Sequence, residues 1–214
     1  MRTVIVNGGN IDHDFALSFL KKHPYDYMIA ADRGMEFLKA AGICPDEIVG
    51  DFDSAESEAL SYFSEKEVSV RRFKPQKDST DMEIAMITAL ERGSTSIVVL
   101  GATGTRIDHV LGSIRNLSIP LKAGVECCLM DAHNRIRMIQ HPIEIKKEEQ
   151  FGKYVSLLAC GGSVEGLTLE GFFYPLDQYL LKADSALGIS NEITGEVGKI
   201  TFRSGRLLVI ESRD

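Results

Sequence analysis

Three short segments of the chain place carboxylates beside groups suited to phosphate. In the first, Asp51 and Asp53 stand two residues apart in Gly-Asp-Phe-Asp-Ser, directly after an apolar run. Side chains two apart on an extended backbone point the same way. Such a pair suits Mg²⁺, which prefers oxygen ligands and is commonly held by one or two carboxylates together with substrate phosphates. The pair is equally compatible with a helix N-cap followed by a first-turn acid.

The second segment is Lys-Asp-Ser-Thr-Asp at residues 77–81. Lys77 could neutralise phosphate oxygens, and Asp81 could join the coordination shell of the cation. Thr80 has two possible roles, because its hydroxyl could donate to a phosphate or cap the helix that follows. The combination indicates a site for phosphate plus metal.

The third segment runs from Gly101 to His109, again between an apolar run and a helix. Gly101 and Gly104 would let the backbone approach a phosphate chain, and Arg106 offers a planar fork for its oxygens. Asp108 could belong to an acidic centre or be an ordinary first-turn acid. His109 could contact phosphate or be a hydrogen-bonded, partly buried imidazole.

These segments need a scaffold that brings them together, and the first 130 residues have the pattern of a parallel sheet. Short Val- and Ile-rich runs alternate with stretches of helical spacing, which is typical of an α/β fold, Rossmann-like, with helices on both faces. Asp32 and Asn7-Gly8-Gly9 also directly follow such runs. Ligands bind at the carboxyl ends of parallel strands, so we expect these segments to converge at one edge. The predicted strands are 3–6, 27–31, 47–49, 68–73, 97–100 and 125–130.

Four helices are predicted in this half, at 15–22, 35–41, 55–64 and 81–92. The last has an apolar face that includes Met82 and Met86, and its start carries the capping-box pattern Thr80-x-x-Glu83. A fifth helix begins near residue 106 and ends before Pro120. We expect its buried stripe to consist of Ile107, Leu111, Ile114 and Leu117.

After about Asp131 the pattern changes to short segments that alternate apolar with polar residues and are separated by glycines. This pattern predicts an antiparallel β-sandwich or small barrel. The sequence therefore suggests an α/β domain at 1–131 and a β domain at 132–214. Predicted strands in the second half are 136–139, 154–159, 163–169, 199–202 and 207–210.

The composition narrows the class of protein. With 24 Lys and Arg against 31 Asp and Glu among 214 residues, the net charge is −7, which argues against a nucleic-acid coat protein.

No apolar run could span a membrane, and the start lacks the zones of a signal peptide, so we expect a cytoplasmic protein. The four cysteines form no CxxC pair, and we expect buried, reduced thiols.

Six motifs, in this order, resemble thiamine pyrophosphokinase over essentially the whole chain. They are Ala-Ala-Asp32-Arg-Gly, Gly-Asp-Phe-Asp-Ser at 50–54, Lys-Asp-Ser-Thr-Asp at 77–81, Gly-Ala-Thr-Gly-Thr-Arg-Ile-Asp-His at 101–109, Leu-x-Asp-x-x-Asn at 129–134 and Gly-Ile-Ser-Asn-Glu at 188–192. The resemblance implies an ATP-binding α/β domain and a β-sandwich that contributes to a thiamine pocket. It also implies transfer of pyrophosphate from ATP to thiamine with release of AMP, and a homodimer with active sites between subunits.

The resemblance implies roles for the residues that match these motifs. Asp51, Asp53 and Asp81 would hold Mg²⁺, while Lys77, Thr80, Gly101, Gly104, Arg106 and His109 would bind ATP and its phosphates. Asp32 and Asp108, with Arg106, would form the reaction centre, and Asn134, Ser190 and Asn191 would bind thiamine. Either Asp32 or Asp108 could accept the proton of the thiamine hydroxyl.

Two features of the chain differ from the family pattern or limit it. The chain has Thr105 where related chains often have Gly, and it contains no Trp, so a ring stacked on thiamine must come from Phe or Tyr.

Two other functions remain open from the sequence. Another Mg²⁺-dependent ATP:alcohol phosphotransferase would carry similar phosphate loops. A nucleotide or vitamin sensor without catalytic activity is the alternative from outside the enzymes, although it would not need so many acids at one phosphate site.

Overall fold

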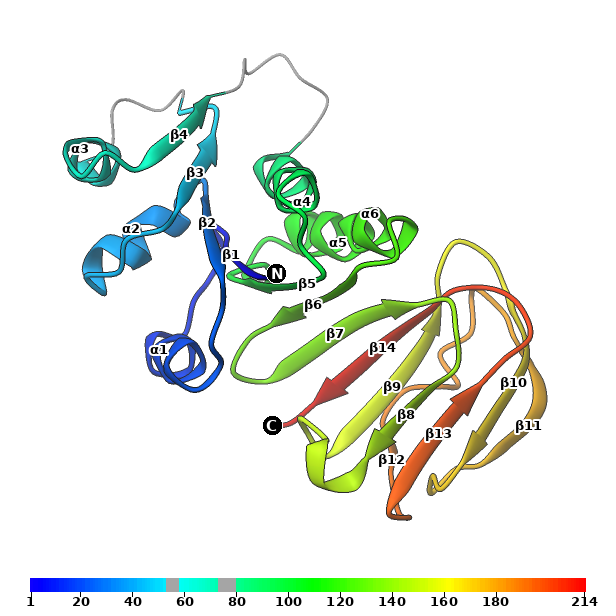
Figure 1. Cartoon of the computed structure of the whole chain (residues 1–214). Helices are drawn as coiled ribbons and strands as arrows, with labels where there is room; N and C mark the ends of the chain where they lie inside the picture. The colour runs from blue at the N-terminus through cyan, green and yellow to red at the C-terminus, as the bar shows by residue number, and fades with distance from the viewer. Residues whose placement is uncertain (53–57, 73–79) are drawn as a thin grey trace. The chain divides into compact units, whose positions relative to one another are not determined.

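The computed structural model describes residues 1–52, 58–72 and 80–214 and divides into two compact units, Met1–Ala132 and His133–Asp214. The first unit is built on six parallel strands in the order β6-β5-β1-β2-β3-β4 (Figure 1). This confirms the predicted α/β class. The strands are β1 (Arg2–Val6), β2 (Tyr27–Ala31), β3 (Glu47–Gly50), β4 (Ser69–Arg72), β5 (Ser96–Leu100) and β6 (Glu126–Met130).

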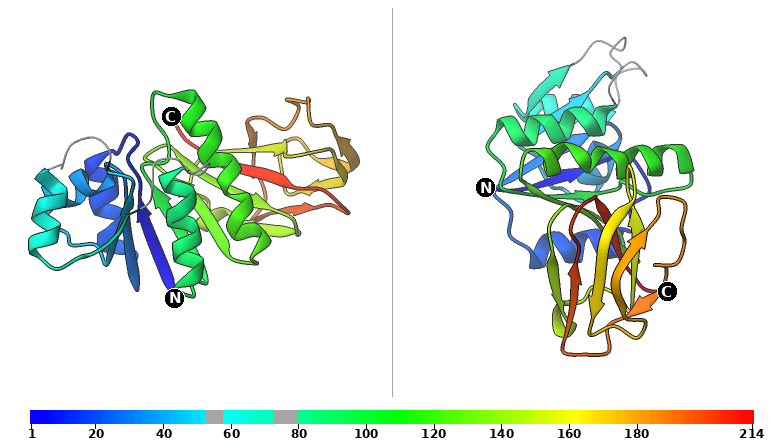
Figure 2. Two further views of the ribbon diagram at one scale, coloured as in Figure 1. Left: turned by 90° about the horizontal axis from the view of Figure 1, so that it is seen from above. Right: turned by 90° about the vertical axis from the view of Figure 1, so that its right-hand side faces the viewer.

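Helices cover both faces of this sheet, which explains why its central strands are almost continuously apolar. Helices α1, α2 and α3 lie on one face, and α4, α5 and α6 lie on the other (Figures 1 and 2). Of the predicted third helix, residues 55–57 lie outside the described residues. The helices are α1 (His13–Lys22), α2 (Gly34–Ala40), α3 (Glu58–Glu65), α4 (Asp81–Glu91), α5 (Ile107–Asn116) and α6 (Ser118–Lys122).

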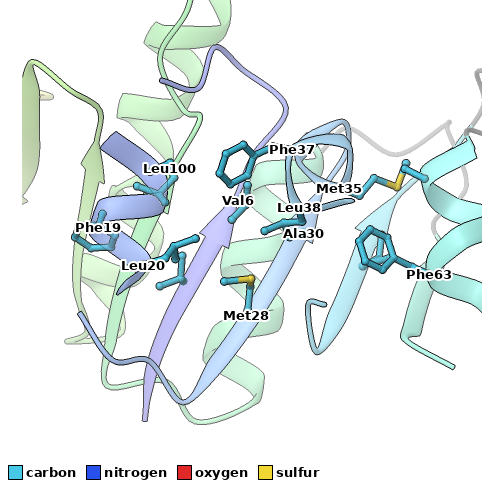
Figure 3. Packing of buried hydrophobic residues seen from close by; sticks show 14 of the residues in the cluster. Val6, Phe19, Leu20, Met28, Ala30, Met35, Phe37, Leu38, Phe63 and Leu100 are labelled. Atoms are coloured by element: carbon cyan, nitrogen blue, oxygen red, sulfur yellow. The ribbon is translucent and has the colours of Figure 1, made fainter. Parts of the chain in front are cut away.

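One hydrophobic cluster joins α1, α2 and α3 to the sheet. Alternate strand residues such as Val6 and Met28 face these helices, because side chains alternate across a strand. Figure 3 shows Phe63 of α3 and Leu38 of α2 pointing into the same cluster. The predicted apolar face of α4 is also buried, at Met82, Ala85, Met86 and Ala89.

The prediction for the fifth helix is wrong in one respect. Ile107 and Leu111 of α5 are 65% and 52% exposed, so their side chains are not part of the core of the first unit. Leu117 is buried, but it follows the helix. Helix α5 ends before Pro120 as predicted, whereas α6 was not predicted; Pro120 is its third residue, where the missing N–H breaks no helical hydrogen bond.

The second unit is a sandwich of two antiparallel sheets with the orders β12-β9-β14-β7 and β11-β10-β13-β8. Residues from both sheets form its core, among them Leu157 and Val209 from one and Leu167 and Ile200 from the other. The sequence predicted an antiparallel unit but missed β8, β11 and β12. The strands are β7 (Asn134–Ile139), β8 (Ile143–Lys146), β9 (Tyr154–Ala159), β10 (Val164–Glu170), β11 (Leu176–Leu181), β12 (Asn191–Glu192), β13 (Val197–Thr201) and β14 (Leu207–Ser212), with a 3-10 turn at Lys147–Glu149.

No helix in the described part of the chain is long and apolar enough to cross a membrane. All four cysteines are free thiols. Cys44 is exposed and the other three are partly buried, so the prediction of reduced thiols agrees with the structure and the prediction that all are buried does not.

Candidate active site at the strand ends

The loops after β1 and β5 are joined through their backbones at the carboxyl edge of the sheet. The N–H of Gly9 donates to the Gly101 carbonyl at 2.8 Å, and that of Asn10 donates to the Thr103 carbonyl at 2.9 Å. A Cβ at Gly9 would overlap the Gly101 oxygen, so only glycine permits this approach. Between β1 and β5 the strand order reverses, and such a switch point is where open α/β sheets bind ligands.

Three predicted acids lie close enough to influence one another. Asp32 follows β2 with a left-handed backbone (φ +50°), Asp51 follows β3, and Asp81 is the first residue of α4. Desolvation raises the pKa of Asp81 to about 6, and the negative charges of Asp32 and Asp51 add to the increase. Partial desolvation of the Asp32 carboxyl, together with the charge of Asp51, likewise raises its pKa.

A divalent cation is the natural complement of such a cluster, because it would stabilise all three carboxylates in their charged form. The donor chemistry fits Mg²⁺, since each group offers hard oxygen ligands. Within residues 1–52, 58–72 and 80–214, no three His, Cys, Asp or Glu side chains are already grouped as a metal site. Asp53, the predicted partner ligand, and Lys77, predicted to bind phosphate, both lie outside the described residues.

Thr80 caps α4, as one of its two predicted roles required. Its hydroxyl accepts a hydrogen bond from the Glu83 N–H at 3.2 Å, and the Asn116 amide donates to the same oxygen at 3.3 Å. These contacts fix the start of α4 and with it the position of Asp81. Both contacts use the hydroxyl oxygen as an acceptor, so the predicted role of the O–H as a donor to phosphate stays a prediction.

Arg106 and Asp108 form an exposed ion pair with each other at the start of α5. The guanidinium Nε and Nη2 lie 3.2 and 2.5 Å from the two carboxylate oxygens. Hydrogen bonds from Arg106 lower the pKa of Asp108 to about 2. His109 and Gly104 are also exposed, so the partly buried imidazole considered for His109 is not observed.

The predicted thiamine residues of the second unit do not all lie together. Ser190 has a left-handed backbone (φ +58°) and is exposed, and its neighbour Asn191 is buried. Asn134 is in the same sheet on β7, but β14 and β9 separate β7 from β12. At about 4.8 Å per strand, that separation is roughly 14 Å.

Asn191 holds an aromatic pair that the sequence alone did not select. Its Oδ1 accepts the Tyr174 N–H at 3.0 Å, and its Nδ2 donates to the Tyr174 carbonyl at 2.8 Å. Phe173 and Tyr174 are 62% and 64% exposed, with ring centroids 4.8 Å apart. The available signal was the aromatic run Gly-Phe-Phe-Tyr-Pro at 171–175, but several other Phe and Tyr residues were equally plausible from sequence.

Two family models match the chain, one in each unit. The model of the thiamin pyrophosphokinase catalytic domain matches residues 18–129, and that of the vitamin B1 binding domain matches residues 140–207. A thiamine pyrophosphokinase of Bacillus subtilis is 35% identical over 187 residues, which are 87% of each chain. The chain belongs to the thiamine pyrophosphokinase family.

Solved structures of this family have the same fold. The crystal structure of thiamine pyrophosphokinase from Bacillus subtilis aligns over the whole of both chains with a TM-score of 0.87 at 32% identity. That of the Geobacillus thermodenitrificans protein aligns with a TM-score of 0.84 at 30% identity, covering 100% of this chain and 98% of the other. The yeast structure, at 17% identity and a TM-score of 0.81, shows the fold alone.

The two family models locate the candidate groups. Asp32, Asp51, Asp81 and Arg106 fall inside the thiamin pyrophosphokinase catalytic model, whereas Ser190 and Asn191 fall inside the vitamin B1 binding model. Asn134 lies between the two matches.

Proposed function

We propose that this protein transfers pyrophosphate from ATP to the hydroxyl of thiamine, giving thiamine diphosphate and AMP. The observation that carries the proposal is the cluster of Asp32, Asp51 and Asp81 in the catalytic unit of a thiamine pyrophosphokinase family member. The negative charges of Asp32 and Asp51 help to raise the pKa of Asp81, as expected of a site suited to a cation. We place the protein in the cytoplasm for two reasons. The reaction needs ATP, which the cytoplasm supplies, and free thiols are typical of a reducing compartment.

Mg²⁺ is the proposed metal, held by Asp51 and Asp81 together with Asp53. When bound, it would neutralise charge on the phosphate oxygens of ATP. The chain's own contribution is to hold these carboxylates in place, since the cap at Thr80 positions Asp81 and the end of β3 positions Asp51.

Phosphate binding is assigned to the loops around the switch point. Gly101 and Gly104 allow close backbone approach, and Arg106, oriented by Asp108, presents its guanidinium at the surface. Lys77, Thr80 and His109 complete this predicted set. The position of Arg106 at the start of α5 adds the partial positive charge of the helix end.

Asp32 is a better proton acceptor than Asp108 for the thiamine hydroxyl. A carboxylate with a pKa near 2 is a weak base and is already hydrogen-bonded to Arg106, whereas partial desolvation raises the pKa of the Asp32 carboxyl above its ordinary value. Asp108 therefore serves Arg106 as a positioning residue.

The thiamine site is proposed around Ser190 and the exposed pair Phe173 and Tyr174. A flat cationic ring suits an aromatic face, and the exposed Ser190 can hydrogen-bond a pyrimidine. Asn191 supports this surface by holding the Tyr174 backbone. Asn134 remains a predicted thiamine contact of this site, supplied from a different strand.

The first test is product identity. Purified protein incubated with ATP, Mg²⁺ and thiamine should form thiamine diphosphate and AMP in equal amounts, measured by liquid chromatography. ADP with thiamine monophosphate would indicate an ATP:alcohol phosphotransferase, and binding of both ligands without product would indicate a sensor. Either result contradicts the proposed reaction.

We also propose a homodimer whose active sites combine the first unit of one chain with the second unit of the other. Exposed apolar side chains support it near both half-sites, at Ile107 and Leu111 beside Arg106 and at Leu187 and Ile189 beside Ser190. Scattering mass should correspond to two chains.

Complementation tests the sharing of the site. Asp81→Asn and Tyr174→Ala proteins should each be inactive, and co-expression should restore about a quarter of the activity, because half of the dimers are mixed and each mixed dimer has one intact site. No recovery in isolated mixed dimers would show that each site belongs to a single chain.

A further inference from the structure

A buried carboxylate at the amino end of β3 has no part in the proposed reaction. Glu47 is the first residue of this strand, and only 1% of it is exposed. Its neighbour Ile48 packs in the hydrophobic cluster with α1, α2 and α3, so Glu47 points to the opposite face of the sheet, where α4 lies (Figure 1). A buried charge needs partners, and those of Glu47 come from three other elements.

Three side chains donate hydrogen bonds to the Glu47 carboxylate. Arg92, at the C-cap of α4, donates to one oxygen through Nε at 3.2 Å and Nη2 at 3.0 Å. The Tyr27 hydroxyl of β2 donates to the same oxygen at 3.0 Å, and Nε of Arg71 in β4 donates to the other oxygen at 3.0 Å. Together these four residues form the Glu47 cluster, which joins the end of α4 to three adjacent strands.

A second contact joins α4 and β3 at their other ends. Helix α4 begins at Asp81, whose carboxylate accepts a hydrogen bond from the backbone N–H of Asp51, the residue after β3. The strand from Glu47 to Asp51 covers about 13 Å, and the helix from Asp81 to Arg92 covers about 16 Å. Helix and strand are therefore of similar length and are joined at both ends.

Apolar packing alone gives α4 a less definite position than the Glu47 cluster does. The buried face of the helix is made of Met82, Ala85, Met86 and Ala89, and hydrophobic contact is non-directional. Methionine side chains also adapt readily to small shifts of their surroundings. The charged hydrogen bonds of Arg92 are directional, so they can fix both the axial position and the rotation of the helix.

We propose that Glu47 is a positioning residue: by holding Arg92, it sets where α4 begins relative to the end of β3. That relation determines the spacing of Asp51 and Asp81, and so the affinity of the acidic cluster for a divalent cation. The inference rests on the proposed function, in which these two carboxylates hold Mg²⁺. Buried ion pairs often stabilise a fold no more than apolar residues of the same volume would, which favours a positional role for this one.

Removing the α4 side of the cluster tests the inference. Arg92→Met leaves Glu47 paired with Arg71 and Tyr27, so the fold should persist. We use Mn²⁺ as the probe, measure the free ion by electron paramagnetic resonance, and count the binding that Asp81→Asn abolishes. The Kd for Mn²⁺ should rise about tenfold, as is usual when a group that orients metal ligands is lost.

The same variant gives a kinetic readout. Half-maximal activity of Arg92→Met should need about tenfold more Mg²⁺, while kcat at saturating Mg²⁺ and the KM for thiamine stay nearly unchanged. The matched control is Lys39→Met, which removes the cation of an ion pair between α2 and α3, 2.6 Å from Glu58. This control should change neither the Kd for Mn²⁺ nor the Mg²⁺ requirement.

A second variant separates position from stability. Combining Glu47→Met, Arg71→Met and Arg92→Met replaces all three charges of the cluster by apolar side chains and leaves none of the three unpaired. The urea midpoint should stay close to that of the wild type or exceed it. Affinity for Mn²⁺ should nevertheless be as low as in Arg92→Met, whereas a role in stability alone would leave it unchanged.

The Mn²⁺ titration needs no substrate, so it is independent of the proposed reaction. If the wild type makes no thiamine diphosphate, the reaction is wrong, and the titration still decides whether Glu47 sets the cation site. Wild-type affinity for Mn²⁺ in Arg92→Met would overturn the inference, as would a wild type that binds no Mn²⁺ through Asp81. A lower kcat with unchanged metal affinity would also contradict it.

Discussion

Asp81→Asn should abolish thiamine diphosphate synthesis and, at the same time, stabilise the metal-free protein at pH 7.5. The carboxyl of Asp81 has a pKa raised to about 6, against 3.8 ordinarily, so the folded chain binds more protons than the unfolded chain between these values. Stability therefore falls as pH rises through about 4 to 6, and the full cost is present above pH 6. Because the side chain is only half buried, we expect about 1–2 kcal/mol.

Calorimetry of the metal-free proteins should accordingly show a higher Tm for Asp81→Asn than for the wild type at pH 7.5 and no difference near pH 4. Mg²⁺ should raise the Tm of the wild type more than that of the variant. Activity should fall by at least about 10³-fold, the scale of losing a group that stabilises transition-state charge. Glu126→Gln, an exposed acid at the start of β6, is the control.

A near-normal rate of Asp81→Asn at saturating Mg²⁺ would reject the metal role of Asp81. A lower Tm at pH 7.5 would show instead that its charge stabilises the metal-free fold. The two measurements are independent, so each can fail alone. Asp51→Asn should share the loss of activity, because it is the second proposed ligand among the described residues.

Glu211→Ala should strongly destabilise the second unit, by about 3–5 kcal/mol, because it leaves two arginines without their buried counter-charge. Glu211 is completely buried in β14. Its carboxylate accepts hydrogen bonds from Arg135 at 2.8 and 2.5 Å, from Arg137 at 2.8 Å and from the Phe151 N–H at 3.0 Å. Urea unfolding followed by circular dichroism measures the loss.

An exposed pair in the same unit provides the control. Arg203 and Glu165 lie 3.9 Å apart and both are largely exposed, so Glu165→Ala should cost less than about 1 kcal/mol. Glu211→Gln should fall between the two, since it keeps the shape and part of the hydrogen bonding. Equal, small losses in all three variants would show that the buried cluster contributes no more than a surface ion pair.

Much of the first unit could be predicted because its sequence signals are local and agree with one another. The runs at 27–31 and 3–6 are buried on both faces, which demands continuous apolar residues, and the intervening helices have regular spacing. The parallel order then required the acids after successive strands to meet at one edge. The negative charge of Asp51 does help to raise the pKa of Asp32, and the charges of Asp32 and Asp51 help to raise that of Asp81, as that argument expects.

The sequence-based predictions failed where burial depends on what covers a segment in the folded chain, or where a strand carries no apolar pattern of its own. The stripe containing Ile107 and Leu111 has the spacing of a core-facing helix, yet it is exposed, because spacing reports only that one face is apolar and not what covers it. Strands β11 and β12 were missed because β12 has only two residues and β11 is mostly exposed. Neither gives a periodic apolar signal.

By itself, the sequence determined the fold class, the resemblance to thiamine pyrophosphokinase and the acids that gather at the sheet edge, because strand periodicity and motif order are properties of the linear chain. Only the tertiary structure decided that Asp108 is paired with Arg106, that Asn191 holds the Tyr174 backbone, and that a cavity opens between the loop after β1 and α2. These depend on distances between atoms and on the solvent that folding excludes. The shift of a carboxyl pKa from its ordinary value, and the space beside that carboxyl, exist only once the chain has folded around them.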